Sequence, residues 1–175
     1  NALSRCGKVM RNYLPATARR WKSLPSLSGL HFSPDLPYWQ DYLPFLQGLA
    51  GPELPSCPRL NAMLPTDLCS AGGHAIRFVA SGELADDNYE QRIHTTGLVS
   101  TRPQSWHDLF NALVWLRYPR IKTALNHLHY QAGAGHRSGE RGPVRDALTL
   151  FDECGVIVIS DRPEVLQALA ERRWR

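Results

Sequence analysis

The sequence lacks the short motifs that mark the best-known enzyme classes. It has no G-x-x-x-x-G-K-[ST] phosphate loop, no G-x-G-x-x-G dinucleotide fingerprint, no G-x-S-x-G nucleophile turn and no H-E-x-x-H zinc motif. It also has no apolar run close to the ~20 residues that a membrane-spanning helix needs. We therefore expect none of these familiar catalytic frameworks and no membrane partner.

Cysteine is scarce, and its positions fit no metal site. The four cysteines are Cys6, Cys57, Cys69 and Cys154. None forms a C-x-x-C pair, and none stands at a zinc-site spacing from a histidine. The hydrophobic segment of a secretory signal is also missing. We therefore predict free thiols and a cytoplasmic location, and we assign no metal ligands. Histidines and carboxylates elsewhere in the sequence also suit a divalent metal, so whether a metal is bound stays open, and the sequence names no cofactor.

Acidic residues are absent from the start of the chain. Six basic residues precede the first acid, Asp35: Arg5, Lys8, Arg11, Arg19, Arg20 and Lys22. Such a segment can contact a polyanion such as nucleic acid, although a solvated arm is the simpler interpretation. With 175 residues, 43% hydrophobic and 21% charged, the chain fits one domain over 1–175. Within it we distinguish a basic N-terminal arm or helix, 1–30, from a core, 31–175.

The next part of the chain is rich in proline, and after it apolar and polar residues alternate with a period of two. Nine prolines lie between residues 14 and 66, so no long helix or central strand can cross this segment. We predict a wrapping segment with short helices over 5–13, 37–49 and 58–64. The alternation predicts strands over 76–80 and 89–96, the second of which would place Glu90, Arg92 and His94 on one face.

The second half of the chain has the periodicity of helices. Ser105 suits an N-cap, with Asp108 at the capping-box position, for a nearly all-apolar helix that ends near Tyr118. Helices then begin at Pro119 and Pro143. The apolar stripes expected to face the core are Ile121, Ala124, Leu125 and Leu128 in the first of these, and Val144, Ala147, Leu148 and Phe151 in the second.

The last segment predicts a strand and a helix. Gly155 would end the helix that begins at Pro143, and the apolar run 156–159 predicts a central strand. A final helix would begin near Pro163. Together these elements predict an α+β fold, with a small, mostly antiparallel sheet covered by several helices.

Polar residues follow the margins of the predicted helices. Asn111 lies in the apolar helix and needs partners, because a buried unpaired amide costs about 1–3 kcal/mol. Histidines and carboxylates can act as general acids and bases, and cations can bind an anionic group. The candidate catalytic residues are His107, Asp108, Asp146 and His129. The candidate ligand-binding residues are Glu90, Arg92, Asn111, Lys122 and Arg145. The same residue types also suit helix caps and structural ion pairs.

Two stretches of the sequence resemble a known bacterial family. They are Trp106-His107-Asp108-Leu109-Phe110-Asn111-Ala112-Leu113-Val114-Trp115-Leu116 and Arg141-Gly142-Pro143-Val144-Arg145-Asp146-Ala147-Leu148-Thr149-Leu150-Phe151-Asp152-Glu153. Both are similar to the family catalogued as domain of unknown function 3025, over roughly residues 30 to 175. Family members tend to have Asn at the place of Cys154 and to continue past Trp174. The resemblance implies a bacterial cytosolic origin, and it implies no activity and no catalytic residues.

The sequence leaves open whether the chain is an enzyme. One hypothesis is a polar pocket that binds an anionic small molecule and performs hydrolytic acid/base chemistry on it. The alternatives are a nucleic-acid-associated module that uses the basic N-terminus, or a protein-binding module whose polar network is purely structural. The first hypothesis requires the polar margins of three helices to meet around one hollow. The sequence does not indicate an oligomeric state.

Overall fold

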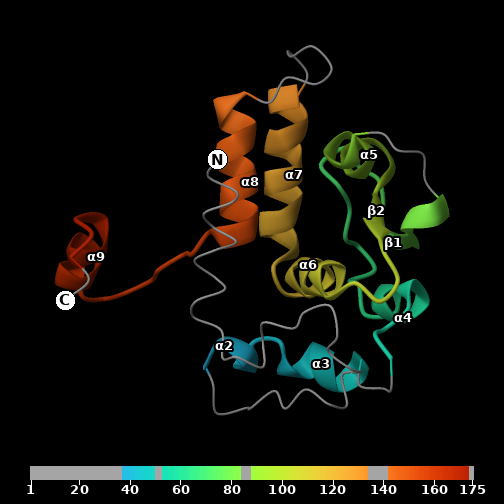
Figure 1. Ribbon diagram of the computed structural model, residues 1–175, viewed down its shortest axis with the longest axis horizontal. Helices are drawn as coiled ribbons and strands as arrows, with labels where there is room; N and C mark the ends of the chain where they lie inside the picture. Colours follow the sequence, from blue (N-terminus) through green and yellow to red (C-terminus); the bar gives the residue numbers. More distant parts are fainter. Residues whose placement is uncertain (1–36, 50–52, 84–87, 134–141, 174–175) are drawn as a thin grey trace.

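Helix α6 (Trp106–Arg117) lies at the centre of the fold. The computed structural model describes residues 37–49, 53–83, 88–133 and 142–173. Figure 1 shows α6 lying at the foot of two upright helices, α7 (Pro119–Gly133) and α8 (Pro143–Cys154). The predicted apolar helix is therefore confirmed, as is its cap, because Ser105 Oγ accepts from Asp108 N–H at 3.3 Å. Its buried residues are Trp106, Asp108, Leu109, Ala112, Leu113, Trp115 and Leu116.

Short helices form the first described part of the chain, as the prolines predict. They are α2 (Pro37–Gln40), α3 (Leu43–Leu49) and α4 (Cys57–Asn61), and Figure 1 places α2 and α3 below α6. Leu46, Leu49 and Leu60 are buried in the same core as the apolar side chains of α6. The predicted helix over 5–13 and the basic arm over 1–30 lie outside the described residues.

A two-stranded parallel sheet packs beside α6. Strand β1 (Arg77–Ala80) pairs with β2 (Leu98–Thr101), with Phe78 opposite Val99. The predicted strand over 76–80 is thus confirmed, and so is the α+β class. The predicted antiparallel order is wrong, because a helical crossover between β1 and β2 lets both strands run the same way. Antiparallel pairing among the described residues is limited to one isolated bridge, Cys69–Ala75.

That crossover contains a helix where the alternation predicts a strand. Residues Tyr89–Thr96 form α5, so the predicted strand over 89–96 is wrong. Asn88 caps its start, and Gly97 ends it at φ +74°, where a Cβ would collide with the carbonyl of Ala75. On a helix, residues 90 and 94 share a face and residue 92 does not. The predicted common face of Glu90, Arg92 and His94 is therefore wrong as well.

Helix α7 buries its polar side more deeply than its apolar side, and α8 leaves much of its apolar side exposed. On α7, Lys122 and Asn126 are 7% and 3% exposed, whereas Leu128 of the predicted apolar stripe is 46% exposed. On α8, Val144 and Phe151 are 60% and 40% exposed, and no residue is fully buried. Of the predicted stripes, Leu125 is buried and Ile121 and Leu148 are half-buried, whereas the other residues are exposed. The predicted stripes are therefore largely wrong as core-facing surfaces, because Lys122 and Asp152 pair between the two helices.

Beyond α8 the chain leaves the body of the fold. Residues 156–159, the predicted central strand, belong to no described strand, and their exposed fractions are 78%, 61%, 46% and 93%. Figure 1 shows this extended segment leading to α9 (Pro163–Ala170), which stands apart from the other elements. The strand prediction is wrong for the described structure, whereas the helix after Pro163 is confirmed.

Two further predictions concern cysteines and membranes. Cys57 and Cys69 take part in no disulfide, in agreement with the prediction. Cys154 is disulfide-bonded, so the prediction of free thiols is wrong for this residue. In the part of the chain that the structure describes, no helix has both the length and the apolar character that a bilayer crossing requires.

Candidate functional site

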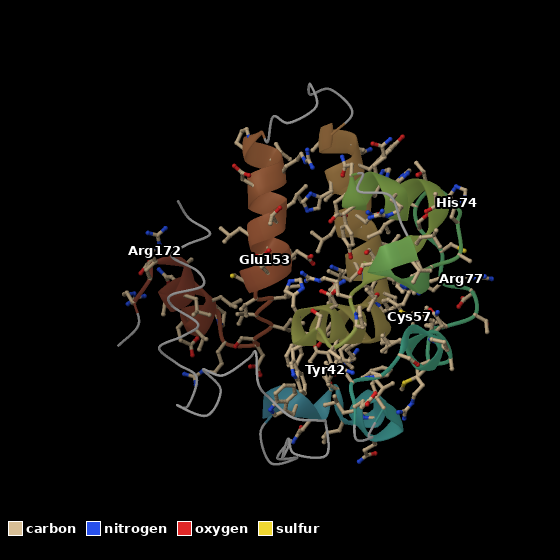
Figure 2. The ribbon with its side chains drawn as sticks, turned by 45° about the vertical axis from the view of Figure 1, so that its right-hand side comes forward. Tyr42, Cys57, His74, Arg77, Glu153 and Arg172 are labelled. Carbon is tan, nitrogen blue, oxygen red and sulfur yellow. The ribbon has the colours of Figure 1, made fainter. Side chains whose placement is uncertain are left out.

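The polar face of α7 borders a small hollow. Lys122, Asn126 and His129 lie on one face of this helix, and all three are buried. They line the hollow together with Tyr89 and Glu90 of α5, Trp115 of α6 and Asp152 of α8. In Figure 2, nitrogen- and oxygen-bearing side chains fill the space between α5, α7 and α8 above α6. The hollow has room for about one water molecule.

A buried ion pair closes one side of the hollow. Lys122 Nζ lies 2.7 and 2.8 Å from the two carboxylate oxygens of Asp152. The side chain of Lys122 is 8% exposed, whereas that of Asp152 is 28% exposed. Lys122 Nζ also lies 5.7 Å from the centre of the Trp115 ring, within the range of a cation–π contact. The pair neutralises the lysine, and its aspartate is the member that solvent reaches.

On the opposite side, Asn126 joins α7 to α5. Its Nδ2 donates to both the backbone carbonyl and the carboxylate Oε2 of Glu90, each at 2.8 Å. Its Oδ1 is buried without a hydrogen-bond partner among the described residues, as is Nε1 of Trp115. A buried donor or acceptor left unpaired costs about 1–3 kcal/mol. The hollow is therefore lined by two residues whose buried polar atoms can still form hydrogen bonds to a ligand.

His129 is poised as a neutral base beside these groups. Burial lowers the pKa of His129 below its ordinary value. Glu90 and Asp152 oppose this change, and Arg145 and Lys122 add to it by repelling the charged imidazolium. The buried Nε of Arg145 has no hydrogen-bond partner in the described structure. His129 can therefore accept a proton near neutral pH.

A second group of charges lies at the start of α6. Arg102 donates to Asp108 through its backbone N–H at 2.7 Å, through Nε at 3.0 Å and through Nη2 at 2.7 Å. His107 Nδ1 lies 2.9 Å from Asp108 Oδ1. Burial alone would raise the pKa of Asp108, but hydrogen bonds from Arg102 and His107 outweigh it and hold that pKa well below its usual range. Asp108 is thus a firmly ionised carboxylate.

The hydrogen bond to Asp108 shifts the pKa of His107 in the opposite direction to that of His129. Its hydrogen bond to the Asp108 carboxylate raises the pKa of His107, and burial offsets only part of this change. The His107 side chain is 73% exposed, so protons and solutes reach it from solvent. The two candidate histidines therefore favour different protonation states, which is a common arrangement for a general acid and a general base.

Asn111 connects the two groups through Tyr89. Asn111 Nδ2 donates to the hydroxyl of Tyr89 at 3.1 Å, so the predicted need for a partner is met. Burial raises the pKa of Tyr89, and the charges of Glu90, Asp152 and Asp108 raise it further. This tyrosine consequently stays neutral, and it stands within the electric field of both carboxylate groups.

The structure gathers most of the candidate residues but not all of them. Glu90, Lys122 and His129 line the hollow, and Asn111 and Arg145 act on groups that line it. His107 and Asp108 form the neighbouring group at α6. Arg92 is half-buried on α5 and lines no part of the hollow, and Asp146 is exposed near the start of α8.

Five residues of this region were not among the candidates. They are Tyr89, Arg102, Trp115, Asn126 and Asp152. The spacing of Asn126 from Lys122 and His129, and of Asp152 from Arg145, could have identified two of them. Arg102 precedes its helix in a turn, and no periodic signal places it near Asp108.

Another cluster of histidines lies outside the hollow. His94 Nε2 is 3.2 Å from His127 Nδ1, and the His94 ring stacks on Tyr130 with centroids 3.8 Å apart. Burial lowers the pKa of His94, and the neighbouring histidines His127 and His74 lower it further. Over the described residues, no group of three or more histidines, cysteines and carboxylates has the geometry to hold a metal ion.

The comparisons with known proteins return one family. No curated protein and no solved structure shows significant similarity to the chain. A family described as "Protein of unknown function (DUF3025)" matches residues 76–175, which cover α5 to α9 and all the residues around the hollow. This match spans more than half of the 175 residues and confirms the resemblance that the sequence predicts. The chain belongs to this family.

Proposed function

We propose that the hollow between α5, α7 and α8 binds a small anionic molecule and performs acid/base chemistry on it, with hydrolysis as the reaction. One observation carries the proposal: two lining residues, Trp115 and Asn126, have buried polar atoms without partners among the described residues, beside a histidine with a lowered pKa. A purely structural network would satisfy such atoms internally. Unmatched groups around a hollow are instead typical of a ligand site.

The charge around the hollow favours an anion that approaches past Asp152. Lys122 is the only lysine on the described part of α7, and its charge is met by Asp152. Because the Asp152 side chain is the more exposed member of the pair, an incoming carboxylate or phosphate can displace it from Lys122. Arg145 adds a second positive charge near His129. The ligand thereby replaces one anion with another and leaves no buried cation unpaired.

The two histidines supply the proton transfers of a hydrolysis. The hollow has room for about one water molecule, so the substrate lies at its mouth beside Lys122 and Asp152. The water inside attacks the electrophilic centre of the substrate and gives its proton to neutral His129. The bond to the leaving group breaks, and the leaving group takes a proton from His107, whose raised pKa favours the imidazolium. Asp108 and Arg102 fix the His107 ring for this step. Proton transfer between the two histidines through solvent restores the starting state.

A paired binding and turnover experiment tests this function. Binding of inorganic phosphate and of acetate is measured by calorimetry, and hydrolysis of p-nitrophenyl phosphate and p-nitrophenyl acetate by absorbance. We expect Lys122→Met to weaken anion binding at least about tenfold, since a charge-assisted contact contributes about 1.5–3 kcal/mol. We expect His129→Gln to keep binding and lose turnover about 100-fold or more, the usual share of a general base.

A histidine on the same helix provides the matched control. His127 also lies on α7, but its ring contacts His94 and lines no part of the hollow. His127→Gln should leave both binding and turnover at wild-type values. Absence of anion binding in the wild type, or equal effects of His127→Gln and His129→Gln, would refute the proposal in favour of a structural network.

A further inference from the structure

The structure leaves a series of large apolar residues exposed on α8, on α9 and on the segment between them. The series consists of the outward residues Val144, Leu150 and Phe151, the segment 156–159, and Leu166 on α9, which are 40% to 93% exposed. Figure 1 shows the segment 156–159 running free between α8 and α9. Exposed apolar surface of this extent marks an interaction site. We call the segment 156–159 the arm.

The arm has the sequence of a buried strand and no strand partner. Its residues Val156, Ile157, Val158 and Ile159 are all β-branched, and they join no sheet among the described residues. An extended apolar segment gains most by adding to a sheet edge, where its peptide groups find partners and its side chains leave water. A strand edge is therefore the surface that fits the arm.

The sheet of this chain has one closed edge and one open edge. On β1, Asn61 Nδ2 donates to the Phe78 carbonyl at 2.9 Å, and Asn61 Oδ1 accepts from the Phe78 N–H at 2.8 Å. The outer edge of β1 is thus occupied by a side chain that imitates a neighbouring strand. No further strand can pair there without displacing Asn61.

The outer edge of β2 is the open one. Because Arg77 N–H donates to the Gly97 carbonyl, the parallel register points the peptide groups of Leu98 and Ser100 away from β1. The N–H of Leu98 is taken by Thr96 Oγ1 at 3.3 Å. The peptide groups of Ser100 have no outward partner within the described residues. This edge and the arm have the same length, since β2 also has four residues.

We propose that two copies of this chain exchange their arms, so that the arm of each copy adds to the outer edge of β2 in the other. The chain supplies both halves of the contact, an unpaired strand and an unpaired edge, and reciprocal exchange satisfies both at once with two-fold symmetry. The arm extends away from the body of its own chain, so it can reach a second copy.

The mass of the chain in solution is the first test. We expect sedimentation equilibrium to show a dimer that dissociates at low micromolar concentration. We expect Ile157→Lys to raise the dimer dissociation constant at least about tenfold, because a lysine in a strand core is poorly tolerated. Leu128→Lys changes an exposed leucine on α7 outside this surface and should leave the dissociation constant unchanged. Far-UV circular dichroism checks that both variants stay folded.

Cross-linking identifies the contact itself. In chains that also carry Cys57→Ser and Cys69→Ser, a Ser100→Cys chain mixed with a Val158→Cys chain should form a disulfide between the two chains under mild oxidation. Neither variant alone should do so. A monomer at every concentration overturns the proposal. So does a Ser100→Cys, Val158→Cys double variant that closes a disulfide within one chain at low concentration, because the arm would then pair with its own β2.

Discussion

Among single residues, Asp108 stands out because it pairs with both Arg102 and His107. Its carboxylate accepts three hydrogen bonds from Arg102 and one from His107, while its side chain is 10% exposed. We expect Asp108→Asn to lower the free energy of unfolding at neutral pH by about 2 kcal/mol, since charge-assisted bonds are lost but Arg102 stays accessible to water. Urea denaturation of both proteins measures the difference.

Repeating the urea denaturation at acidic pH distinguishes the loss of the Asp108 charge from a disturbance of packing. The folded-state pKa of Asp108 lies below its unfolded value, so its stabilising effect is complete above the unfolded pKa and disappears as pH falls toward the folded one. The gap between wild type and Asp108→Asn should therefore be full at neutral pH and close in acid. A gap that persists unchanged in acid would mean that the variant only disturbs packing.

His107 and His129 should titrate on opposite sides of the ordinary histidine pKa. The raised pKa of His107 means that its stabilising effect is present below the unfolded pKa and is lost as pH rises through the folded value. At His129 the unfolded state binds more protons, so the free energy of unfolding increases with pH and stability is lost as pH falls below the unfolded pKa. Nuclear magnetic resonance of the imidazole carbons gives both titration curves.

A single substitution should change the titration curve of one histidine and leave that of the other unchanged. Asp108→Asn removes the carboxylate that raises the pKa of His107, so the His107 curve should move toward lower pH. The curve of His129 should stay in place, because Asp108 is not among the groups that shift it. Equal midpoints for both histidines in the wild type would contradict the proposed division into acid and base.

Residues at regular helical spacing can be identified from the sequence, whereas residues placed by tertiary contacts cannot. Lys122, Asn126 and His129 follow a three-and-four-residue spacing, so their common face could be predicted. Arg102 reaches Asp108 from an irregular turn, and Trp115 looked like any core aromatic until its Nε1 proved to have no described partner. Such contacts depend on how helices cross, which periodicity does not encode.

At the scale of elements, Asn61 closes the edge of β1 and ties it to α4. Its two hydrogen bonds serve both peptide groups of Phe78, whose side chain is 1% exposed. We expect Asn61→Ala to lower the free energy of unfolding by about 3 kcal/mol, because one buried donor and one buried acceptor lose their partner. Thermal or urea unfolding measures this loss.

The opposite end of α4 supplies the control for this variant. Ser56 occupies the N-cap of α4, but its side chain makes no capping hydrogen bond. Ser56→Ala should therefore change the free energy of unfolding by less than about 0.5 kcal/mol, as for an ordinary surface substitution. If both variants lost the same amount, the edge would not depend on Asn61.

Helix α5 shows why local alternation misled the prediction of elements. Ile93, Thr95 and Thr96 favour a strand, and the period-two pattern supports one. The end signals favour a helix instead: Asn88 Oδ1 accepts from Gln91 N–H at 3.5 Å, and Gly97 adopts the left-handed conformation that ends helices. Over eight residues the two caps and the packing of Ile93 outweigh the alternation.

For helices α7 and α8, the predicted core-facing side was wrong for a different reason. Periodicity located a polar and an apolar side on each helix, but the rule that the apolar side faces inward failed. Lys122 and Asp152 satisfy each other between the helices, so the polar sides can be buried, while Val144 and Phe151 stay outside. Such an arrangement is stable only where something else covers the apolar side.

For the molecule as a whole, the described structure divides into a packed body and an appended part, which consists of the arm and α9. The body joins α3 to α7 around a core centred on α6, whereas α9 shares no extensive interface with any described element. A segment without packing opens to proteases at almost no free-energy cost. Exchange of arms between two copies would remove that weakness by burying the segment in a sheet.

Limited proteolysis at two concentrations therefore reports on the whole assembly. Thermolysin cuts before large apolar residues, so its first cuts among the described residues should fall within 156–159 when the protein is dilute. The fragment that ends there should keep its far-UV circular dichroism, because its core residues all precede the cut. At high concentration the dimer should slow this cleavage in proportion to the remaining monomer, which mass spectrometry of the digest measures. First cuts within α6 or α7, or a cleavage rate that ignores concentration, would show that the arm is neither the weak point of the monomer nor the contact of the dimer.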